Sequence, residues 1–340
     1  MTRQIAVIGA GSWGTTLANL LAAKGNAVTL WCFEEELAAR MQRTRENDLY
    51  LPGFQLDKGL EITAEMENAV AGRQVLLFVS PSQVTRQVVQ QALPFIDSAA
   101  LFVSAAKGIE NDSLMLLSEV FAELLPEQQL ARVGYLSGPS FAREVSQKMP
   151  TAVVAAARQQ EVAEQIQQIF STDQFRVYRH NDIIGVELGG ALKNVIALAA
   201  GVADGFGFGY NTRAALITRG LAEMTRLGLK LGGAAETFAG LAGMGDLVLT
   251  CTGDLSRNRS VGIELGKGRR LKEVLAGMQM IAEGVKTTLS AYQLAQKNQV
   301  EVPIIEQMYQ ILYQDKEPRA AVTDLMQRGL KAEPVTGEGT

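Results

Sequence analysis

The chain has 340 residues, which at roughly 100 to 200 residues per domain predicts two domains. Its 32 lysines and arginines against 36 aspartates and glutamates give a net charge of −4, too little positive charge to hold a nucleic acid. Hydrophobic residues at 47% and charged residues at 20% exclude a disordered chain and predict a sizeable core.

Membrane segments, metal sites and disulfides find little support in the sequence. The apolar run at residues 195–202 is flanked by polar residues and is far shorter than the ~18 residues of a spanning helix. Cys32 and Cys251 lie far apart without metal-ligand spacing, and His180 is the single histidine. The N-terminus shows no secretory cleavage pattern. We therefore expect no membrane span, no metal and a cytoplasmic protein.

Strand-like and helix-like segments alternate in the first half of the chain. Strand patterns occur at residues 5–8, 27–31, 75–79, 100–104, 133–136, 152–157 and 175–178, and helical patterns at 12–23, 83–92, 114–125 and 160–170. This alternation predicts an α/β fold, a doubly wound, Rossmann-like and mostly parallel sheet. We expect it to form a dinucleotide-binding domain over residues 1–180.

Beyond residue 180 the strand patterns stop and helical patterns follow one another. They occur at residues 184–202, 212–227, 234–241, 271–276, 285–297 and 304–313. We expect an all-helical, substrate-binding and catalytic domain over residues 181–330. Residues 331–340 then form a flexible tail.

Residues 9–14, with the sequence GAGSWG, match the pattern G-x-G-x-x-G between a strand and a helix. There Gly9 makes the tight turn, Gly11 lets the backbone approach a pyrophosphate, and Gly14 lets helix and strand pack closely. The helix N-terminus offers N–H groups to the same pyrophosphate. A glycine-rich turn without a ligand is the alternative, and the strand-helix-strand context favours dinucleotide binding.

Residues 31–36, with the sequence WCFEEE, follow the second strand and contain no basic residue. An acidic residue there accepts the adenosine ribose hydroxyls, whereas an arginine favours a 2′-phosphate, so the pattern favours NAD over NADP. Alternatively, the glutamates occupy the first turn of a helix, where negative charge suits the helix dipole. Both interpretations stay open at this point.

Polar residues follow three strands, at residues 80–82, 104–108 and 137–140. The carboxyl ends of parallel strands form the edge where ligands bind in open α/β sheets. Each segment is also an ordinary turn sequence. Lys107 stands out because a cation beside the crevice stabilises charge on a substrate, a solvated surface lysine being the alternative.

Lys193 lies in an otherwise apolar helical segment, residues 187–196. Burial lowers a lysine pKa from ~10.4 toward the range of a proton donor or acceptor. Gly189 and Gly190, one turn earlier, are expected to leave room on this face for a small ligand. A lysine that reaches out to solvent from the helix edge is the alternative.

Two further motifs lie in the helical half. Asp246 precedes Thr250 by four residues on a candidate helix, so the two share a face, although a plain N-cap aspartate is the alternative. Ser256, Arg257 and Asn258 combine a helix cap with a guanidinium, a good phosphate receptor, the alternative being a solvated face.

Together these motifs resemble, in order and to about residue 330, the bacterial NAD(P)-dependent glycerol-3-phosphate dehydrogenases. The resemblance rests on residues 8–14, 107–108, 137–140, 190–194, 245–251 and 256–258. Within these, the Leu-Lys-Asn and Ser-Arg-Asn segments are more selective than the glycine pattern. The resemblance implies interconversion of sn-glycerol 3-phosphate and dihydroxyacetone phosphate with NAD(H) or NADP(H), supplying phospholipid synthesis.

The resemblance also implies roles for individual residues. Lys193 matches the family's proton acceptor, and the substrate contacts are Lys107, Gly138, Ser140, Lys193, Asp246, Ser256, Arg257 and Asn258. The implied cofactor contacts, with the glycine turn, are Gly9, Gly11, Ser12, Trp13, Gly14, Phe33, Lys107, Ala142, Arg257, Ile281 and Glu283. Phe33 stands where relatives frequently carry a basic residue or histidine, which weakens the expectation of NADP.

The expected chemistry centres on Lys193, which exchanges the proton of the oxygen on the substrate's second carbon. Lys107 stabilises the developing charge and helps to lower the pKa of Lys193. Asp246, with Thr250 on the same helix face, orients Lys193 or the terminal hydroxyl of the substrate. Arg257 and Asn258 hold the substrate's phosphate.

Two other functions remain as alternatives. One is a β-hydroxyacid dehydrogenase of similar two-domain build, whose substrate carries a carboxylate in place of the phosphate. The other is a non-catalytic dinucleotide sensor that reports the redox state to a partner. A homodimer is compatible with the sequence, which does not determine the oligomeric state.

Overall fold

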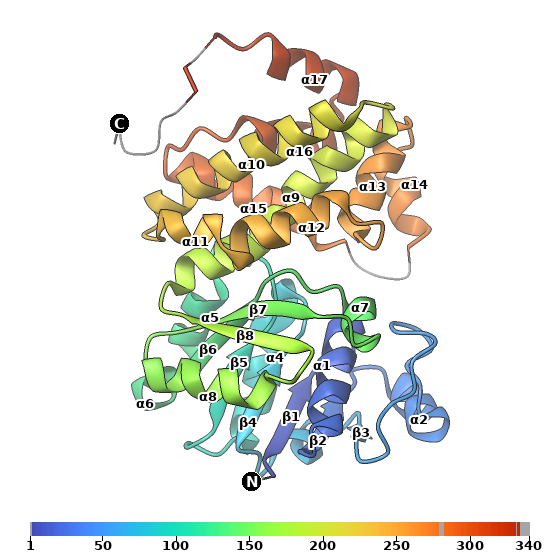
Figure 1. Ribbon diagram of the computed structural model, residues 1–340, viewed down its shortest axis with the longest axis vertical. Helices are drawn as coiled ribbons and strands as arrows, with labels where there is room; N and C mark the ends of the chain where they lie inside the picture. Colours follow the sequence, from blue (N-terminus) through green and yellow to red (C-terminus); the bar gives the residue numbers. More distant parts are fainter. Residues whose placement is uncertain (1, 279–281, 331, 334–340) are drawn as a thin grey trace.

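The computed structural model describes residues 2–278, 282–330 and 332–333 and places an eight-stranded sheet beneath a layer of helices (Figure 1). The strands are β1 Gln4–Ile8, β2 Ala27–Trp31, β3 Glu61–Thr63, β4 Val75–Phe78, β5 Leu101–Ser104, β6 Val133–Ser137, β7 Thr151–Ala157 and β8 Phe175–His180. Their order in the sheet is β3-β2-β1-β4-β5-β6-β7-β8. The expected α/β fold with a helical second half is confirmed.

The strands β1 to β6 are parallel, and β1 lies between β2 and β4: Ile5 pairs with Val28 on one side and Val75 on the other. β7 departs from this arrangement because it runs antiparallel to β6, and β8 follows β7 in parallel. The short connection at residues 138–150 has no long crossover helix, which a parallel return would need. The carboxyl ends of β1 to β6 therefore form one edge, which faces the helical half (Figure 1).

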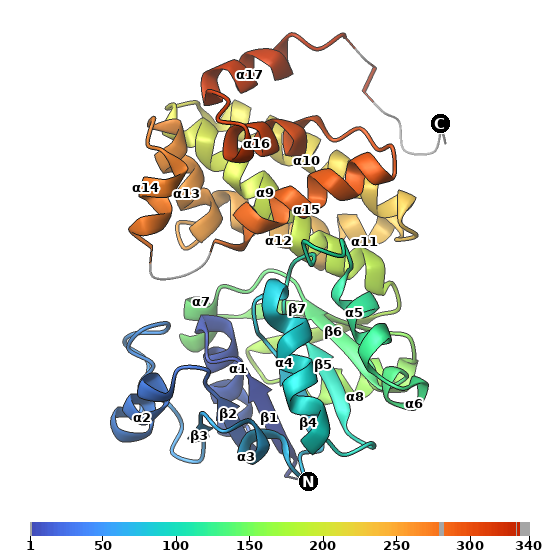
Figure 2. The same cartoon turned by 180° about the vertical axis from the view of Figure 1, so that it is seen from behind.

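Helices cover both faces of this sheet. They are α1 Ser12–Ala23, α2 Glu35–Thr44, α3 Met66–Val70, η1 Ser82–Val84, α4 Thr85–Ala92, η2 Leu93–Phe95, α5 Leu117–Leu124, α6 Glu127–Leu130, α7 Ala142–Ser146 and α8 Gln160–Phe170. Successive side chains of a strand point to opposite faces of the sheet, so Val7 and Ile8 of β1 belong to two different hydrophobic cores. Helices α1 and α8 lie on one face in Figure 1, and α4 and α5 lie on the other in Figure 2.

The second half of the chain is helical as far as it is described. Its elements are α9 Ile183–Gly205, α10 Tyr210–Lys230, α11 Ala235–Ala239, the π-helical turn η3 Leu241–Gly245, α12 Asp246–Thr252, α13 Arg257–Gly266, α14 Leu271–Ala276, α15 Glu283–Lys297, α16 Pro303–Tyr313 and α17 Pro318–Met326. Since β8 ends at His180 and α9 begins at Ile183, the expected division after residue 180 falls in a two-residue connection. Of the expected tail, residues 331 and 334–340 lie outside the described part.

Helix α9 forms the centre of the helical half, with every residue from 185 to 203 buried. By length and composition it would suffice to cross a membrane, but 83% of its most apolar stretch is buried inside the protein, as in a core helix. A Cβ on Gly201 would lie 2.1 Å from the Arg259 carbonyl oxygen, and one on Gly262 would lie 2.1 Å from that of Leu198. Glycines thus let α9 and α13 pack backbone against backbone.

Several elements differ from the sequence expectations. Helices α3 and α17 and strand β3 were not expected because they are short, and α2 was expected only in one of the two interpretations of residues 31–36. The helix expected from residue 114 begins only at Leu117, because Leu114 adopts a left-handed conformation with φ of 60°.

Candidate active site

The glycine-rich turn between β1 and α1 has a geometry that suits a pyrophosphate. Gly9 has a φ of +119°, a region that favours glycine, and a Cβ on Gly14 would lie 1.8 Å from the Gly9 carbonyl oxygen. Gly11 faces open space, with nothing within 4 Å of where its Cβ would be, and no side chain caps α1 there. The residues present therefore fit a dinucleotide at the N-terminus of α1.

Other expected cofactor contacts surround this turn. The Ser12 hydroxyl donates to the Tyr50 carbonyl oxygen at 2.6 Å, and the Trp13 ring packs on Phe175 with centroids 6.3 Å apart. Ala142 begins α7, which contacts α1. Ser12, Trp13 and Ala142 are thus brought near one another at the sheet edge.

The residues after β2 separate the two interpretations of the acidic segment. Glu35 and Glu36 lie in the first turn of α2, as the helix-dipole interpretation predicted. Glu34 stands just before the helix, and its side chain does not cap it. Phe33 is 77% exposed and meets Trp31 edge to face at 6.1 Å, so its other surface is available to a flat ring.

Two lysines from the two halves of the chain meet on one carboxylate. Lys193 of α9 donates to Asp246 Oδ1 and, at 2.9 Å, to Thr250 Oγ1, both residues belonging to α12. Lys107, which follows β5, donates to Asp246 Oδ2 at 2.6 Å and to the Gly138 carbonyl oxygen at 3.0 Å. The structure therefore brings together the four expected catalytic residues and one further expected substrate contact, Gly138.

Burial dominates the electrostatics of this cluster. Asp246 is 0% exposed and Lys193 is 7% exposed. Burial lowers the pKa of Lys193 to about 8; the Asp246 carboxylate opposes this shift and the Lys107 ammonium reinforces it. Burial alone would raise the pKa of Asp246, but the charges of the two lysines outweigh it and the net pKa is lowered. Lys193 can therefore gain or lose a proton near neutral pH while Asp246 stays ionised.

Gly189 and Gly190, which precede Lys193, were expected to leave room for a small ligand, but they serve helix packing instead. A Cβ on Gly189 would lie 2.5 Å from the Ala242 carbonyl oxygen, and one on Gly190 would lie 2.7 Å from Ser137 Oγ. This face is thus filled by the chain itself, and the expectation of ligand space there was wrong. The glycines instead let α9 approach η3 and the end of β6, which places Lys193 over the strand ends.

The segment after β6 ends close to Lys107. Gly138 has a φ of +132°, and a Cβ there would lie 3.0 Å from the Val153 Cα, so glycine is required. The Ser140 hydroxyl donates to the Gly138 carbonyl oxygen at 3.0 Å. Gly138 and Ser140 therefore lie at the same sheet edge as the lysine cluster.

The Ser-Arg-Asn segment starts α13. Ser256 caps the helix by accepting from the Arg259 N–H at 3.2 Å, as an ordinary N-cap does. Asn258 is 8% exposed; its amide donates to Asn194 Oδ1 at 2.9 Å and its oxygen accepts from the Gly284 N–H at 3.0 Å. Asn258 thus joins α13 to α9 and α15, and its partner Asn194 directly follows Lys193.

Arg257 is exposed at the first position of α13, and Glu283 begins α15. Burial raises the pKa of Glu283, and Arg257, Lys107 and Lys193 act in the opposite direction, in decreasing order. These three cations and Glu283 therefore share one electrostatic environment. Ile281, expected to contact the cofactor, lies outside the described residues.

Some residues near these groups were not expected from the sequence. Asn194, a buried amide directly after Lys193, gave the same signal as the lysine, a polar residue in an apolar helix. Asn47 and Tyr50 hold the glycine turn from a loop whose sequence has no periodicity, so no pattern indicated them. In the described ranges, no three His, Cys, Asp or Glu side chains are grouped as a metal site.

A cavity of about 700 Å³ lies elsewhere among the described residues. It is lined by α5, the start of α9 and the end of α15, including Ser118, Ile184 and Lys297. None of the expected site residues lines it. The chemistry expected from the sequence is thus associated with the sheet edge and α9, not with this cavity.

Comparison with known proteins gives a family. Models described as the N-terminus and C-terminus of NAD-dependent glycerol-3-phosphate dehydrogenase match residues 4–163 and 182–323. A glycerol-3-phosphate dehydrogenase of the NAD(P)+ type from Syntrophotalea carbinolica is 62% identical over 97% of this chain and 99% of its own length.

Solved structures agree with the family models. The glycerol-3-phosphate dehydrogenase of Coxiella burnetii has a TM-score of 0.92 at 40% identity, over 96% of this chain and 99% of that one. The enzyme of the same name from Saccharomyces cerevisiae has a TM-score of 0.80 at 28% identity, over 96% and 100%. The resemblance seen in the motifs is confirmed, and the chain belongs to the NAD-dependent glycerol-3-phosphate dehydrogenase family.

Proposed function

We propose that this chain is an NAD(P)-dependent dehydrogenase that interconverts sn-glycerol 3-phosphate and dihydroxyacetone phosphate, supplying phospholipid synthesis. The observation that carries the proposal is Lys193, a buried amine held by Asp246 and Thr250 where α9 crosses the strand ends. Family membership supports the same reaction, since the relatives bear that name. Residues 1–180 supply most of the dinucleotide contacts, and residues 181–330 supply the proton carrier and most of the substrate contacts.

Proton transfer is the task of Lys193. The bound nicotinamide supplies or accepts the hydride at the second carbon of the substrate. In the direction of reduction the Lys193 ammonium donates its proton to the oxygen on that carbon, and in oxidation the neutral amine accepts it. A pKa of about 8 leaves both forms populated near neutral pH. Asp246 and Thr250 fix the position of Nζ, and Lys107 stabilises negative charge on the same oxygen.

The substrate phosphate is assigned to the start of α13. Arg257 is exposed there, beside the N-terminus of a ten-residue helix, and both features favour a phosphate. Asn258 and Ser256 hold this segment against α9 and α15, so they position the guanidinium. Gly138 and Ser140, next to Lys107, line the opposite side of the substrate.

The cofactor contacts follow the sheet edge from the glycine turn to the second half of the chain. We assign them to Gly9, Gly11, Ser12, Trp13, Gly14, Phe33, Lys107, Ala142, Arg257 and Glu283, with Ile281 as a further assignment outside the described residues. Their support is the open face of the turn, the exposed Phe33 ring, and the position of Glu283 in the field of Arg257.

A substrate panel tests the function against its alternatives. Loss of reduced-nicotinamide absorbance is followed with dihydroxyacetone phosphate, with unphosphorylated dihydroxyacetone, and with the oxo form of a β-hydroxy acid. We expect turnover on the phosphorylated ketone and little on the other two. Preference for the carboxylate substrate would favour the β-hydroxyacid dehydrogenase, and cofactor binding without any turnover would favour the sensor.

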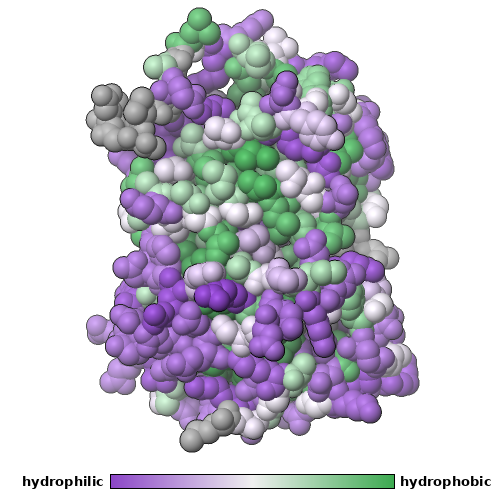
Figure 3. Space-filling model, viewed as in Figure 1, coloured by the Kyte–Doolittle hydropathy of each residue, from purple (hydrophilic) through white to green (hydrophobic). Residues whose placement is uncertain are grey.

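We also propose a cytoplasmic location and a homodimer. Cys32 and Cys251 are both buried and unpaired with each other, which suits a reducing compartment. Figure 3 shows apolar side chains gathered on the helical half, and Val248 of α12 is a large hydrophobic residue that is 39% exposed. Sedimentation equilibrium tests the dimer: we expect twice the chain mass, and a single chain mass would contradict it.

A further inference from the structure

The amino-terminal edge of the sheet carries arginines just before three of its parallel strands. Arg3 precedes β1, Arg73 lies two residues before β4, and Arg132 precedes β6. Because β1, β4, β5 and β6 are parallel neighbours, their first residues meet at one edge. This edge lies near the N-terminus, on the far side of the sheet from the helical half (Figures 1 and 2). The three cations are therefore gathered away from the lysine cluster.

A cavity of about 300 Å³ lies between these arginines. The three arginines line it together with Gln74 and with Gln165 of α8. Among the described residues that line it, Asp97 is the one acid. Ligand sites in proteins occupy about 300–1,000 Å³, so this volume suits a small molecule. The charged side chains around that space are mostly positive.

Arg132 is a partly buried residue with an unpaired donor. Its Nε is shielded from solvent and has no hydrogen-bond partner among the described residues. Neither Arg132 nor Arg3 makes a side-chain hydrogen bond or an ion pair with any of those residues. A buried donor without a partner costs free energy. An acceptor that enters the cavity would remove this cost.

Arg73, in contrast, is held by the surrounding chain. Its Nε donates to the Ala69 carbonyl oxygen at 3.1 Å, and its Nη1 donates to Gln4 Oε1 at 2.8 Å. Its Nη2 lies 3.6 Å from Glu61 Oε2, an ion pair that offsets part of its charge. Arg73 therefore forms a fixed wall of the cavity.

The nearby acid does not offset the charge of the other two arginines. Asp97 is exposed, and its Oδ1 accepts from the Ala99 N–H at 2.8 Å within its own turn. Arg3 and Arg132 therefore present two guanidinium groups without a carboxylate partner in the described residues, although the net charge of the chain is −4. This local excess of positive charge favours an anion.

We propose that this cavity, the arginine pocket lined by Arg3, Arg73 and Arg132, binds the phosphate group of a small molecule. A phosphate carries up to about two negative charges and three acceptor oxygens, which match two free guanidinium groups. The side-chain amide of Gln165 offers a further donor. The inference goes beyond the proposed reaction, because the pocket shares no residue with the candidate active site.

A phosphate in the arginine pocket has a structural consequence. It links the beginnings of β1 and β6, which are separated in the sheet by β4 and β5. Because the ligand binds the folded arrangement of these strands, it stabilises the dinucleotide domain by mass action. The catalytic groups at the opposite edge remain untouched.

Isothermal titration calorimetry tests the pocket with inorganic phosphate and with glycerol 2-phosphate, against sodium chloride, at a constant ionic strength of ~0.15 M. All proteins carry Arg257→Ala, which removes the phosphate contact proposed for the active site. This background protein is compared with versions that also carry Arg132→Gln or Arg3→Gln. The matched control is Arg270→Gln, which removes an exposed arginine that precedes α14 and does not line the pocket.

We expect at least one of the two phosphate compounds to bind the background protein with a dissociation constant below about 1 mM. Arg132→Gln and Arg3→Gln should each weaken this binding about tenfold, because each removes a charged donor. Arg270→Gln should leave it unchanged. Tighter binding of the ester assigns the pocket to an organic phosphate, and tighter binding of inorganic phosphate assigns it to the free ion.

Turnover of dihydroxyacetone phosphate provides a separate control. With Arg257 intact, Arg132→Gln should keep the wild-type kcat, since Arg132 lies at the opposite edge of the sheet from Lys193. If Arg132→Gln folds poorly, Arg3→Gln, near the start of the chain, carries the same test.

Two results would overturn the inference. One is a dissociation constant above about 10 mM for both phosphate compounds in the background protein. The other is an equal effect of the pocket variants and of Arg270→Gln. Failure of the proposed reaction would be a distinct result, because calorimetry measures binding in the pocket without any turnover.

Discussion

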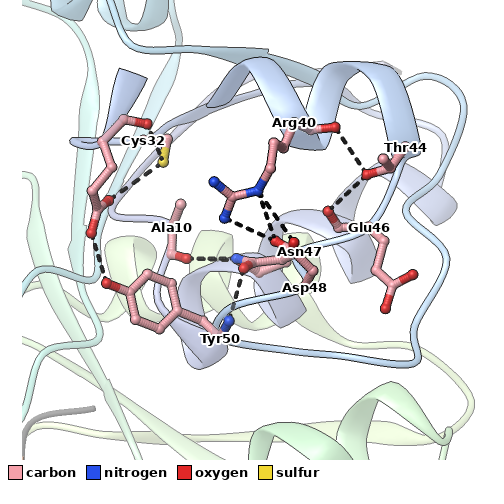
Figure 4. A network of polar contacts seen from close by, with 10 residues as sticks. Ala10, Cys32, Arg40, Thr44, Glu46, Asn47, Asp48 and Tyr50 are labelled. Atoms are coloured by element: carbon pink, nitrogen blue, oxygen red, sulfur yellow. Dashed lines mark hydrogen bonds and ion pairs between the residues drawn. The ribbon is translucent and has the colours of Figure 1, made fainter. Parts of the chain in front are cut away.

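The two polar clusters of this protein differ in burial, and their expected effects differ accordingly. The cluster of Lys193, Asp246 and Lys107 is enclosed between α9, α12 and the strand ends, with Asp246 0% exposed. The hydrogen-bonded pair of Glu34 and Tyr50 lies partly exposed just beyond the carboxyl end of β2 (Figure 4). Burial shifts a pKa and makes each charge depend on its partners, whereas a partly exposed carboxylate acts through a weaker, screened field.

The largest expected effect is that of Lys193→Ala in the buried cluster. We expect kcat to fall at least ~100-fold, because the general acid-base group is lost. The dissociation constant for the dinucleotide should change little. As a control, Lys286→Ala removes an exposed lysine from α15 and should keep wild-type turnover. Near-normal kcat in folded Lys193→Ala would refute the assignment.

Asp246→Asn should weaken the same cluster in a way that depends on pH. The Asp246 carboxylate favours the Lys193 ammonium, so its loss should lower the pKa of Lys193 below about 8. A shift of one unit leaves about one tenth as much ammonium at pH values above that pKa. The alkaline fall of kcat for ketone reduction should therefore move to lower pH. An unmoved pH profile would show that Asp246 does not control this amine.

Arg257→Ala tests an exposed charged residue at the start of α13. We expect KM for dihydroxyacetone phosphate to rise about tenfold, as expected for a lost hydrogen bond to a charged group. Activity on an unphosphorylated analogue, measured at saturating cofactor, should be much less affected. Equal losses on both substrates would show that Arg257 does not hold the phosphate.

Glu187→Gln tests how burial of a carboxylate affects stability at a residue that has no role in the proposed reaction. Glu187 of α9 accepts from the Ser118 N–H at the start of α5, and burial raises its pKa to about 8. Between the unfolded pKa near 4.5 and about 8, the folded state binds the extra proton, so the free energy of unfolding falls as pH rises. Glutamine keeps the acceptor and should remove this loss, which amounts to about 4 kcal/mol between pH 5 and pH 8.5. Denaturant midpoints at pH 5 and pH 8.5 measure it, and equal pH dependence in both proteins would contradict it.

The sequence predicted most of the sheet and the members of the buried cluster for one physical reason. A lysine in an apolar helix, or glycines after a strand, depart from what a simple core requires, so Lys193 and residues 9–14 were visible without coordinates. The ion pair between Lys107 and Asp246 was not visible, because it joins residues 139 positions apart through the tertiary structure.

Elements set by tertiary contact were harder to predict. Helix α13 was not expected in full because glycine is a poor helix former, yet Gly262 is needed where α13 meets α9. The same cause made the expectation of ligand space at Gly189 wrong, since the Ala242 carbonyl oxygen fills it. Tyr50 gave no signal because its loop has no periodic pattern and its role arises from one hydrogen bond to Glu34.

The central claim is that Lys193 carries the proton in both directions, and a pair of pH profiles tests it most directly. With saturating cofactor, kcat for reduction of dihydroxyacetone phosphate should fall, and kcat for oxidation of sn-glycerol 3-phosphate should rise, as pH increases through about 8. The two limbs should share one apparent pKa and disappear in Lys193→Ala. Profiles that are flat between pH 6.5 and 9.5, or limbs that persist unchanged in that variant, would contradict the account.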